Sequence, residues 1–134
     1  MATELLLAAG TKSWGDIASV LTESISELLE GEASVVTASM PNSGQRVDAR
    51  RLDNGQLRLS AAGNDSLVGG DRLTVSDERA VIAVGFSVGS ASWGNFYWDW
   101  SVPVTAEHVA SGIVRTMRDI YKGESTDIEV STVL

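Results

Sequence analysis

Residues 45–62 read QRVDARRLDNGQLRLSAA, and this stretch decides the fold. The pair Asn54-Gly55 stands between two strand-like runs, and Asn-Gly in that position is the strongest short signal for a β-hairpin. Leu57 and Leu59 alternate with polar residues, which predicts a strand with one face in water. The sequence therefore predicts an antiparallel hairpin with a tight turn at this pair, and a positive φ at Gly55 as a primed turn requires.

Three segments outside the hairpin carry helical signals. Ser13 and Asp16 have the spacing of a capping box and mark the start of a first helix that ends before Gly31. A short helix is expected over residues 76–84, and Thr105 is expected to cap a last helix that runs to about Lys122. The first and last helices have apolar stripes that predict burial, formed by Trp14, Ile17, Leu21, Ile25, Val109, Ile113 and Met117.

Two more stretches are typical of strands. Residues 33–39 are short and β-branched. Residues 95–102 place Phe96, Trp98 and Trp100 on one face and polar residues with Tyr97 on the other, a period of two. The tail over residues 128–133 is expected to be a last edge strand or an extended arm.

These elements predict an α+β fold with a single antiparallel β-sheet and helices packed on it. The expected order is α-β-β-β-α-β-α, with a possible C-terminal edge strand. Residues 1–12 are expected to form a loose N-terminal arm or a short extra helical turn, and residues 13–134 a single domain, a size that can bury a core of its own.

Composition excludes several classes of function. The formal net charge is −8, which argues against a general basic surface for nucleic acid and against anionic membranes. The chain has no cysteine, so disulfides, thiolate metal sites and cysteine nucleophiles are excluded. No apolar run approaches membrane-spanning length, and the cytoplasm is the expected location.

Residue types needed for catalysis are scarce. His108 is the only histidine, and a lone histidine without a recognisable nucleophile favours a surface or packing role over catalysis. The acids near residues 65–78 lack the spacing of a calcium loop, and no Gly-Lys-Ser/Thr tripeptide indicates a phosphate loop. The sequence therefore predicts no enzyme activity, no cofactor and no bound metal, the last of which elemental analysis can check.

The best candidates for binding are aromatic and arginine side chains. Large aromatics on one strand face usually fill a core, so the Phe96 face is expected under the helices. Trp93 and Tyr97 lie off that face and are the better candidates for exposed contacts. Four arginines gather on the hairpin near two aspartates, and we single out Arg50 and Arg51 because arginine is enriched at interfaces; the whole set is Arg46, Arg50, Arg51 and Arg58, with Asp48 and Asp53.

Several short motifs along residues 14–130 give the chain a family resemblance. They comprise leucines in the loop at Leu67 and Leu73, then Val84-Gly85-Phe86, Asn95-Phe96, Thr116-Met117-Arg118 and Tyr121. With them the chain resembles the TY-Chap domains, actinobacterial domains related to type III secretion chaperones and YbjN proteins. Phe86 stands where the family usually has tryptophan and Met117 where it has leucine, and a proline common after the Gly-aromatic pair is absent.

The resemblance implies a chaperone-like fold that binds peptides and shields a segment of a partner protein. It offers no catalytic residues to carry over. The expected function is a non-enzymatic peptide-binding module, chaperone or adaptor, and a homodimer is possible. Two alternatives remain open: an immunity-type inhibitor of a toxin, for which the acidic charge suits a nuclease groove, and a small-molecule or sugar-binding domain that uses the tryptophan strand.

Overall fold

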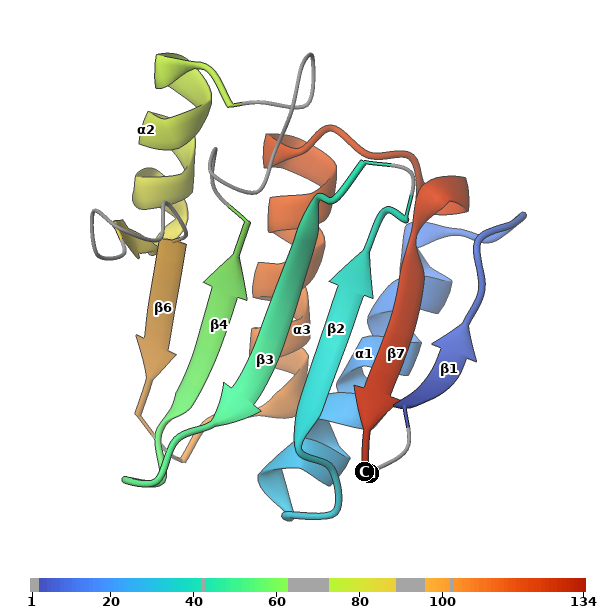
Figure 1. Ribbon diagram of the computed structural model, residues 1–134, viewed down its shortest axis with the longest axis vertical. Helices are drawn as coiled ribbons and strands as arrows, with labels where there is room; N and C mark the ends of the chain where they lie inside the picture. Colours follow the sequence, from blue (N-terminus) through green and yellow to red (C-terminus); the bar gives the residue numbers. More distant parts are fainter. Residues whose placement is uncertain (1–2, 42, 63–72, 89–95, 102) are drawn as a thin grey trace.

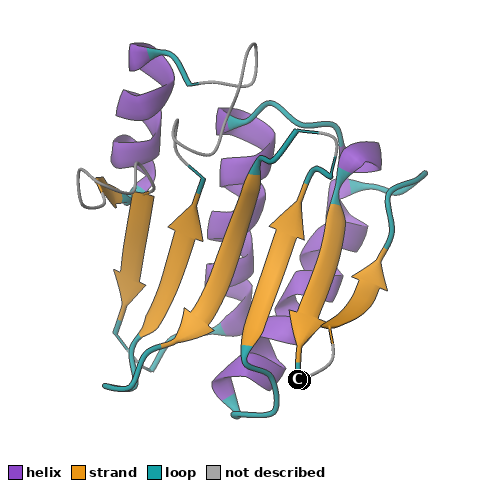
Figure 2. Ribbon diagram, in the orientation of Figure 1, coloured by secondary structure: helices purple, strands orange, loops and turns teal. Residues whose placement is uncertain are grey.

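The computed structural model describes residues 3–41, 43–62, 73–88, 96–101 and 103–134, which form one antiparallel sheet and three α-helices (Figures 1 and 2). The order of strands across the sheet is β1-β7-β2-β3-β4-β6-β5. The strands are β1 (Thr3–Leu7), β2 (Val35–Ser39), β3 (Arg46–Arg51), β4 (Leu57–Ala61), β5 (Ser87–Val88), β6 (Phe96–Trp100) and β7 (Glu129–Val133). The helices are α1 (Trp14–Leu29), α2 (Val75–Val84) and α3 (Ala106–Arg115). The predicted α+β class with a single antiparallel sheet is confirmed.

Helices α1 and α3 lie side by side against one face of the sheet (Figure 1). The strand side chains beneath them are fully buried and apolar, for example Val36, Val47, Leu59 and Val130. The predicted stripes of α1 and α3 face the same core, except that Trp14 is only half-buried at its rim. Burial of this apolar surface is the main stabilising contribution to the fold.

The helix starts follow their capping residues. In α1 the Asp16 amide donates to Ser13 Oγ at 3.1 Å, and the Ser13 amide donates to the Asp16 carboxylate at 2.9 Å. Thr74 and Asp77 form the same reciprocal box before α2. Thr105 Oγ1 accepts from the amide of His108 at the start of α3. The capping box predicted at Ser13 and the cap predicted at Thr105 are confirmed.

The last helix does not keep one geometry as far as Lys122. After α3 the backbone widens into a π-helical segment, Thr116–Ile120, which the Tyr121 amide closes by donating to the Thr116 carbonyl. Lys122 then takes a left-handed conformation with φ 57°, which ends the helix. The Tyr121 hydroxyl donates to the Ala62 carbonyl at 2.6 Å, so this wider turn fixes the helix end to the sheet. Burial raises the pKa of the Tyr121 phenol.

The hairpin between β3 and β4 is confirmed, but its turn is not the primed type predicted. The Leu52 amide donates to the Gln56 carbonyl and the Gly55 amide donates to the Leu52 carbonyl, so three residues form the loop. Gly55 has φ 87°, whereas Asn54 is not at positive φ as a type I′ turn requires. The loop is thus a turn followed by a glycine in the left-handed region. The Asn54 side-chain carbonyl accepts a hydrogen bond from the Gln56 amide, which adds support to this loop.

Replacing Gly55 with alanine should lower the free energy of unfolding by about 1 kcal/mol, because a non-glycine residue is strained at positive φ. A Cβ there would meet nothing within 4 Å, so the cost is purely conformational. Urea unfolding monitored by circular dichroism measures it. An unchanged midpoint would contradict the left-handed assignment.

The two ends of the described chain differ from expectation. Residues 3–7 form β1, which pairs with β7, so the prediction of a loose arm or helical turn is wrong there. Residues 129–133 are a strand as predicted, but β7 lies inside the sheet between β1 and β2 instead of at its edge. The reason is that strand neighbours are chosen by long-range pairing: the partner that covers the outer side of β7 comes from the opposite end of the sequence.

Candidate functional site

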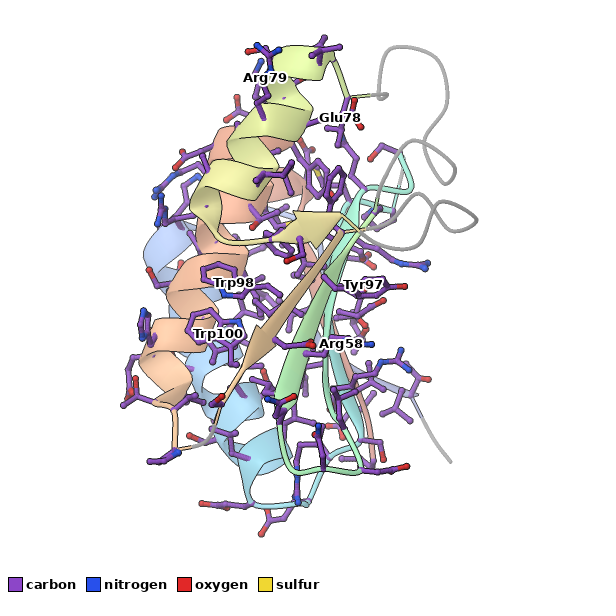
Figure 3. The ribbon with its side chains drawn as sticks, turned by 90° about the vertical axis from the view of Figure 1, so that its left-hand side faces the viewer. Arg58, Glu78, Arg79, Tyr97, Trp98 and Trp100 are labelled. Atoms are coloured by element: carbon purple, nitrogen blue, oxygen red, sulfur yellow. The ribbon has the colours of Figure 1, made fainter. Side chains whose placement is uncertain are left out.

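The face of the sheet opposite α1 and α3 carries polar and charged side chains, and no helix among the described residues covers it (Figures 1 and 3). We call it the open face. Strand alternation and register place on it side chains from six strands: Thr3, Leu5, Val35, Thr37, Ser39, Arg46, Asp48, Arg50, Arg58, Ser60, Tyr97, Asp99, Glu129, Ser131 and Val133. The alternation predicted for Leu57 and Leu59 is what turns Arg58 and Ser60 outward.

A hollow of about 400 Å³ lies on this face over β3, β4 and β6. Its lining comprises Arg46, Asp48, Arg50, Leu52, Arg58, Ser60 and Tyr97. The hollow therefore crosses three neighbouring strands, and most of its lining side chains can donate or accept hydrogen bonds.

Arg58 is held in place from two sides. Its Nε and Nη2 atoms donate to the two carboxylate oxygens of Asp99 at 2.7 and 3.0 Å, a bidentate pair across β4 and β6. Its guanidinium carbon lies 4.9 Å from the centre of the Tyr97 ring, within range of a cation–π contact (Figure 3). The hydrogen bonds from Arg58 hold the pKa of Asp99 below its ordinary value, against the opposing effect of burial.

Asp48, the aspartate in the lining of the hollow, also has partners. Asp48 accepts a hydrogen bond of 2.7 Å from the Thr37 hydroxyl on β2, and its other oxygen lies 3.5 Å from Arg46 Nε. Arg50, two residues further along β3, has neither a hydrogen-bond nor an ion-pair partner among the side chains of the described residues. The hollow thus has three arginines and one aspartate, Asp48, in its lining, and Asp99 beside it pairs with Arg58. Among the described residues, Arg50 has no acidic partner.

The predicted binding residues are only partly brought together. Arg50 and Tyr97 both line the hollow. Arg51, the next residue after Arg50, points to the opposite face, where its guanidinium lies beside Gly31 at the end of α1. Trp93 lies outside the described residues. Arg46 and Arg58 complete the cluster. The even spacing of Arg46 from Arg50 within β3 is the signal that separates it from Arg51, whereas Arg58 joins from β4 through the strand register.

The tryptophans of β6 point toward the helices and not to the open face (Figure 3). Trp100 is buried and Trp98 half-buried, with ring centres 4.4 Å apart, and Trp98 packs edge-on against Phe86. The expectation that the Phe96 face belongs to the core is confirmed. The open face accordingly has Tyr97 as its aromatic residue on β6, and the tryptophan strand does not offer a stacking platform there.

The described residues show no sign of a metal centre. Within them, no three side chains of His, Cys, Asp or Glu gather closely enough to hold a metal ion. His108 is exposed at the start of α3, where its ring packs edge-on against Trp100 with centres 4.9 Å apart. None of the helices in the described ranges has the length and apolar character needed to cross a membrane.

A second hollow, of about 580 Å³, lies on the outer side of the helices between α1 and α3. Small residues such as Ala18 and Ala110 form its floor, and two acids, Glu23 and Glu107, stand in its lining. It lacks aromatic and arginine side chains, the residue types that dominate binding energies at interfaces. The open face is therefore the stronger candidate.

Comparison with known proteins gives one match. No curated protein and no solved structure is found similar to the chain. A family model does match, over residues 8–127, and it is described as T3SS (YopN, CesT) and YbjN peptide-binding chaperone 3. The match includes the three helices and the strands that line the hollow, and it leaves out β1 and β7. The resemblance inferred from the short motifs is thereby confirmed, and the chain belongs to the TY-Chap3 family of chaperone-like peptide-binding domains.

Proposed function

We propose that this protein is a non-enzymatic, chaperone-like module that shields or presents an extended segment of a partner protein on the open face. The observation that carries the proposal is the hollow over β3, β4 and β6, with Tyr97 and Arg50 in its lining. Tyrosine and arginine are, together with tryptophan, the residue types enriched among binding hot spots. Membership of a family described as peptide-binding supports a polypeptide as the ligand.

The shape of the site favours an extended segment over a compact ligand. The hollow is open to solvent along a sheet surface, and it spans three strands whose outward side chains repeat every second residue. An extended peptide has the same two-residue repeat, so alternate side chains can enter the hollow while the others remain in water.

Replacing Tyr97 or Arg50 with alanine should reduce capture of the partner by roughly tenfold or more, because each substitution removes an anchoring side chain from the lining of the hollow. The measurement is a quantitative pull-down from host lysate with purified variants. Folding should be nearly intact in both, since neither side chain belongs to the buried core, and circular dichroism checks this.

Arg51→Ala is the matched control for Arg50→Ala. The two arginines are neighbours in β3 and both exposed, but they lie on opposite faces of the sheet. Capture should be unchanged by Arg51→Ala. Equal losses for Arg50→Ala and Arg51→Ala, or no loss for Tyr97→Ala with the fold intact, would place the binding surface elsewhere.

We propose that the module acts in the cytoplasm as a chaperone or adaptor and binds neither nucleic acid nor membrane, which the net charge of −8 supports. A captured folded toxin, instead of an unfolded segment, would favour the immunity-type inhibitor. We propose β1 as the contact strand of a homodimer, because it is an edge strand with Leu5 exposed, and light scattering tests this.

A further inference from the structure

We infer that the segment bound on the open face is acidic, and that the hollow receives side-chain carboxylates of the partner between Arg50 and Arg58. This inference rests on the proposed function and adds to it the chemistry of the ligand. It runs against the overall composition, since a chain with a net charge of −8 would be expected to select a basic partner.

The local charge of the hollow is opposite to that of the chain. Two of its arginines already face aspartates: Arg58 is paired with Asp99, and Arg46 lies near Asp48. Asp48 also accepts a hydrogen bond from Thr37, so its carboxylate has partners on both oxygens. The charge of Arg50 is left without a counter-charge from the described residues, and an anion can supply it.

The position of Arg50 tells where that anion would bind. Arg50 and Arg58 are directly opposite each other in the β3–β4 register, and like charges in this arrangement destabilise a sheet. A carboxylate placed between them relieves this repulsion. Asp99 and Tyr97 fix the Arg58 guanidinium before any ligand arrives, so little side-chain freedom is lost there on binding.

The acids of the protein leave this site available. On the open face, Asp48 and Asp99 are already engaged, and Glu129 lies on β7, separated from Arg46 on β3 by the intervening strand β2. The acids of α1 lie in the helical layer on the other side of the sheet, and charges separated by more than about 8 Å are largely screened at physiological salt. The second hollow, between α1 and α3, has in contrast Glu23 and Glu107 in its own lining. An acidic segment is therefore directed to the open face and away from the helices.

Fluorescence anisotropy with synthetic peptides tests the inference. The probe is a labelled, extended ten-residue peptide of alternating Thr and Glu, acetylated and amidated at its ends so that only side-chain carboxylates are present. A version with Gln for every Glu is the neutral isostere, and one with Lys for every Glu reverses the charge. The Glu peptide should bind at least about tenfold more tightly than the Gln peptide, and raising the salt from about 50 mM to 500 mM should weaken it.

Two variants locate the carboxylate. Arg50→Gln should lower the affinity for the Glu peptide about tenfold and leave that for the Gln peptide unchanged, whereas Arg51→Gln on the opposite face should alter neither. No binding of the Glu peptide, equal binding of Glu and Gln peptides, tighter binding of the Lys peptide, or equal effects of the two variants would overturn the inference. The proposed function fails separately, if Tyr97→Ala and Arg50→Ala leave capture of the natural partner unchanged.

Discussion

Replacing Gly85 with alanine should lower the free energy of unfolding by about 3 kcal/mol or more. Gly85 ends α2 with φ 141°, a conformation that costs a residue with a side chain roughly 1–3 kcal/mol. A Cβ on this residue would also stand 2.6 Å from two ring atoms of Trp98, which is far inside van der Waals contact. Trp98 cannot move freely, because Phe86 and Trp100 pack against its ring, and overpacking of this kind adds about 1–3 kcal/mol.

Gly112→Ala is the matched control, since it adds a methyl group against the same indole. Gly112 lies inside α3, and a Cβ there would be 3.4 Å from Trp98, an ordinary contact. Alanine is favoured over glycine in a helix interior by about 0.5–1 kcal/mol, so this variant should be as stable as the parent or more stable. Urea unfolding of both variants, followed by circular dichroism, separates the two cases. Equal midpoints for them would show that neither the φ at residue 85 nor the contact with Trp98 constrains the fold.

Replacing Ile113 with alanine should cost about 2–5 kcal/mol, because it leaves a cavity at the centre of the core. Ile113 is fully buried on the face of α3 that meets the sheet and α1. Ser111→Ala in the same helix is the control: Ser111 is exposed, so its replacement should change stability by no more than about 0.5 kcal/mol. Thermal and urea unfolding measure both. A loss below about 1 kcal/mol for Ile113→Ala would mean that α3 does not pack on the sheet as described.

The sequence predicts the residue types of the proposed binding site, but not which individual residues lie together in it. Tyr97 was expected to be exposed because it alternates with core aromatics, and it does line the hollow. The hairpin arginines are grouped in the sequence analysis because they are near in sequence. In a strand, however, neighbouring side chains point to opposite faces, so Arg50 lies on the open face and Arg51 on the other. Arg58 lies beside Arg50 because β4 pairs with β3. The pairing of Arg58 with Asp99 joins residues 41 positions apart, which no local pattern predicts.

Local signals in the sequence determined the parts of this protein that depend on neighbours along the chain. Short-range geometry and side-chain chemistry account for four of these parts: the caps at Ser13 and Thr105, the apolar stripes of α1 and α3, the hairpin at Gly55, and the two-residue period of β6. The tertiary structure alone decided the order of the strands, the insertion of β7 between β1 and β2, and the hollow on the open face, where Arg50 meets Arg58 and Tyr97. The physical reason is that strand pairing and the choice of covered face are settled by contacts between distant segments, whose energies exceed the local preferences of any one strand.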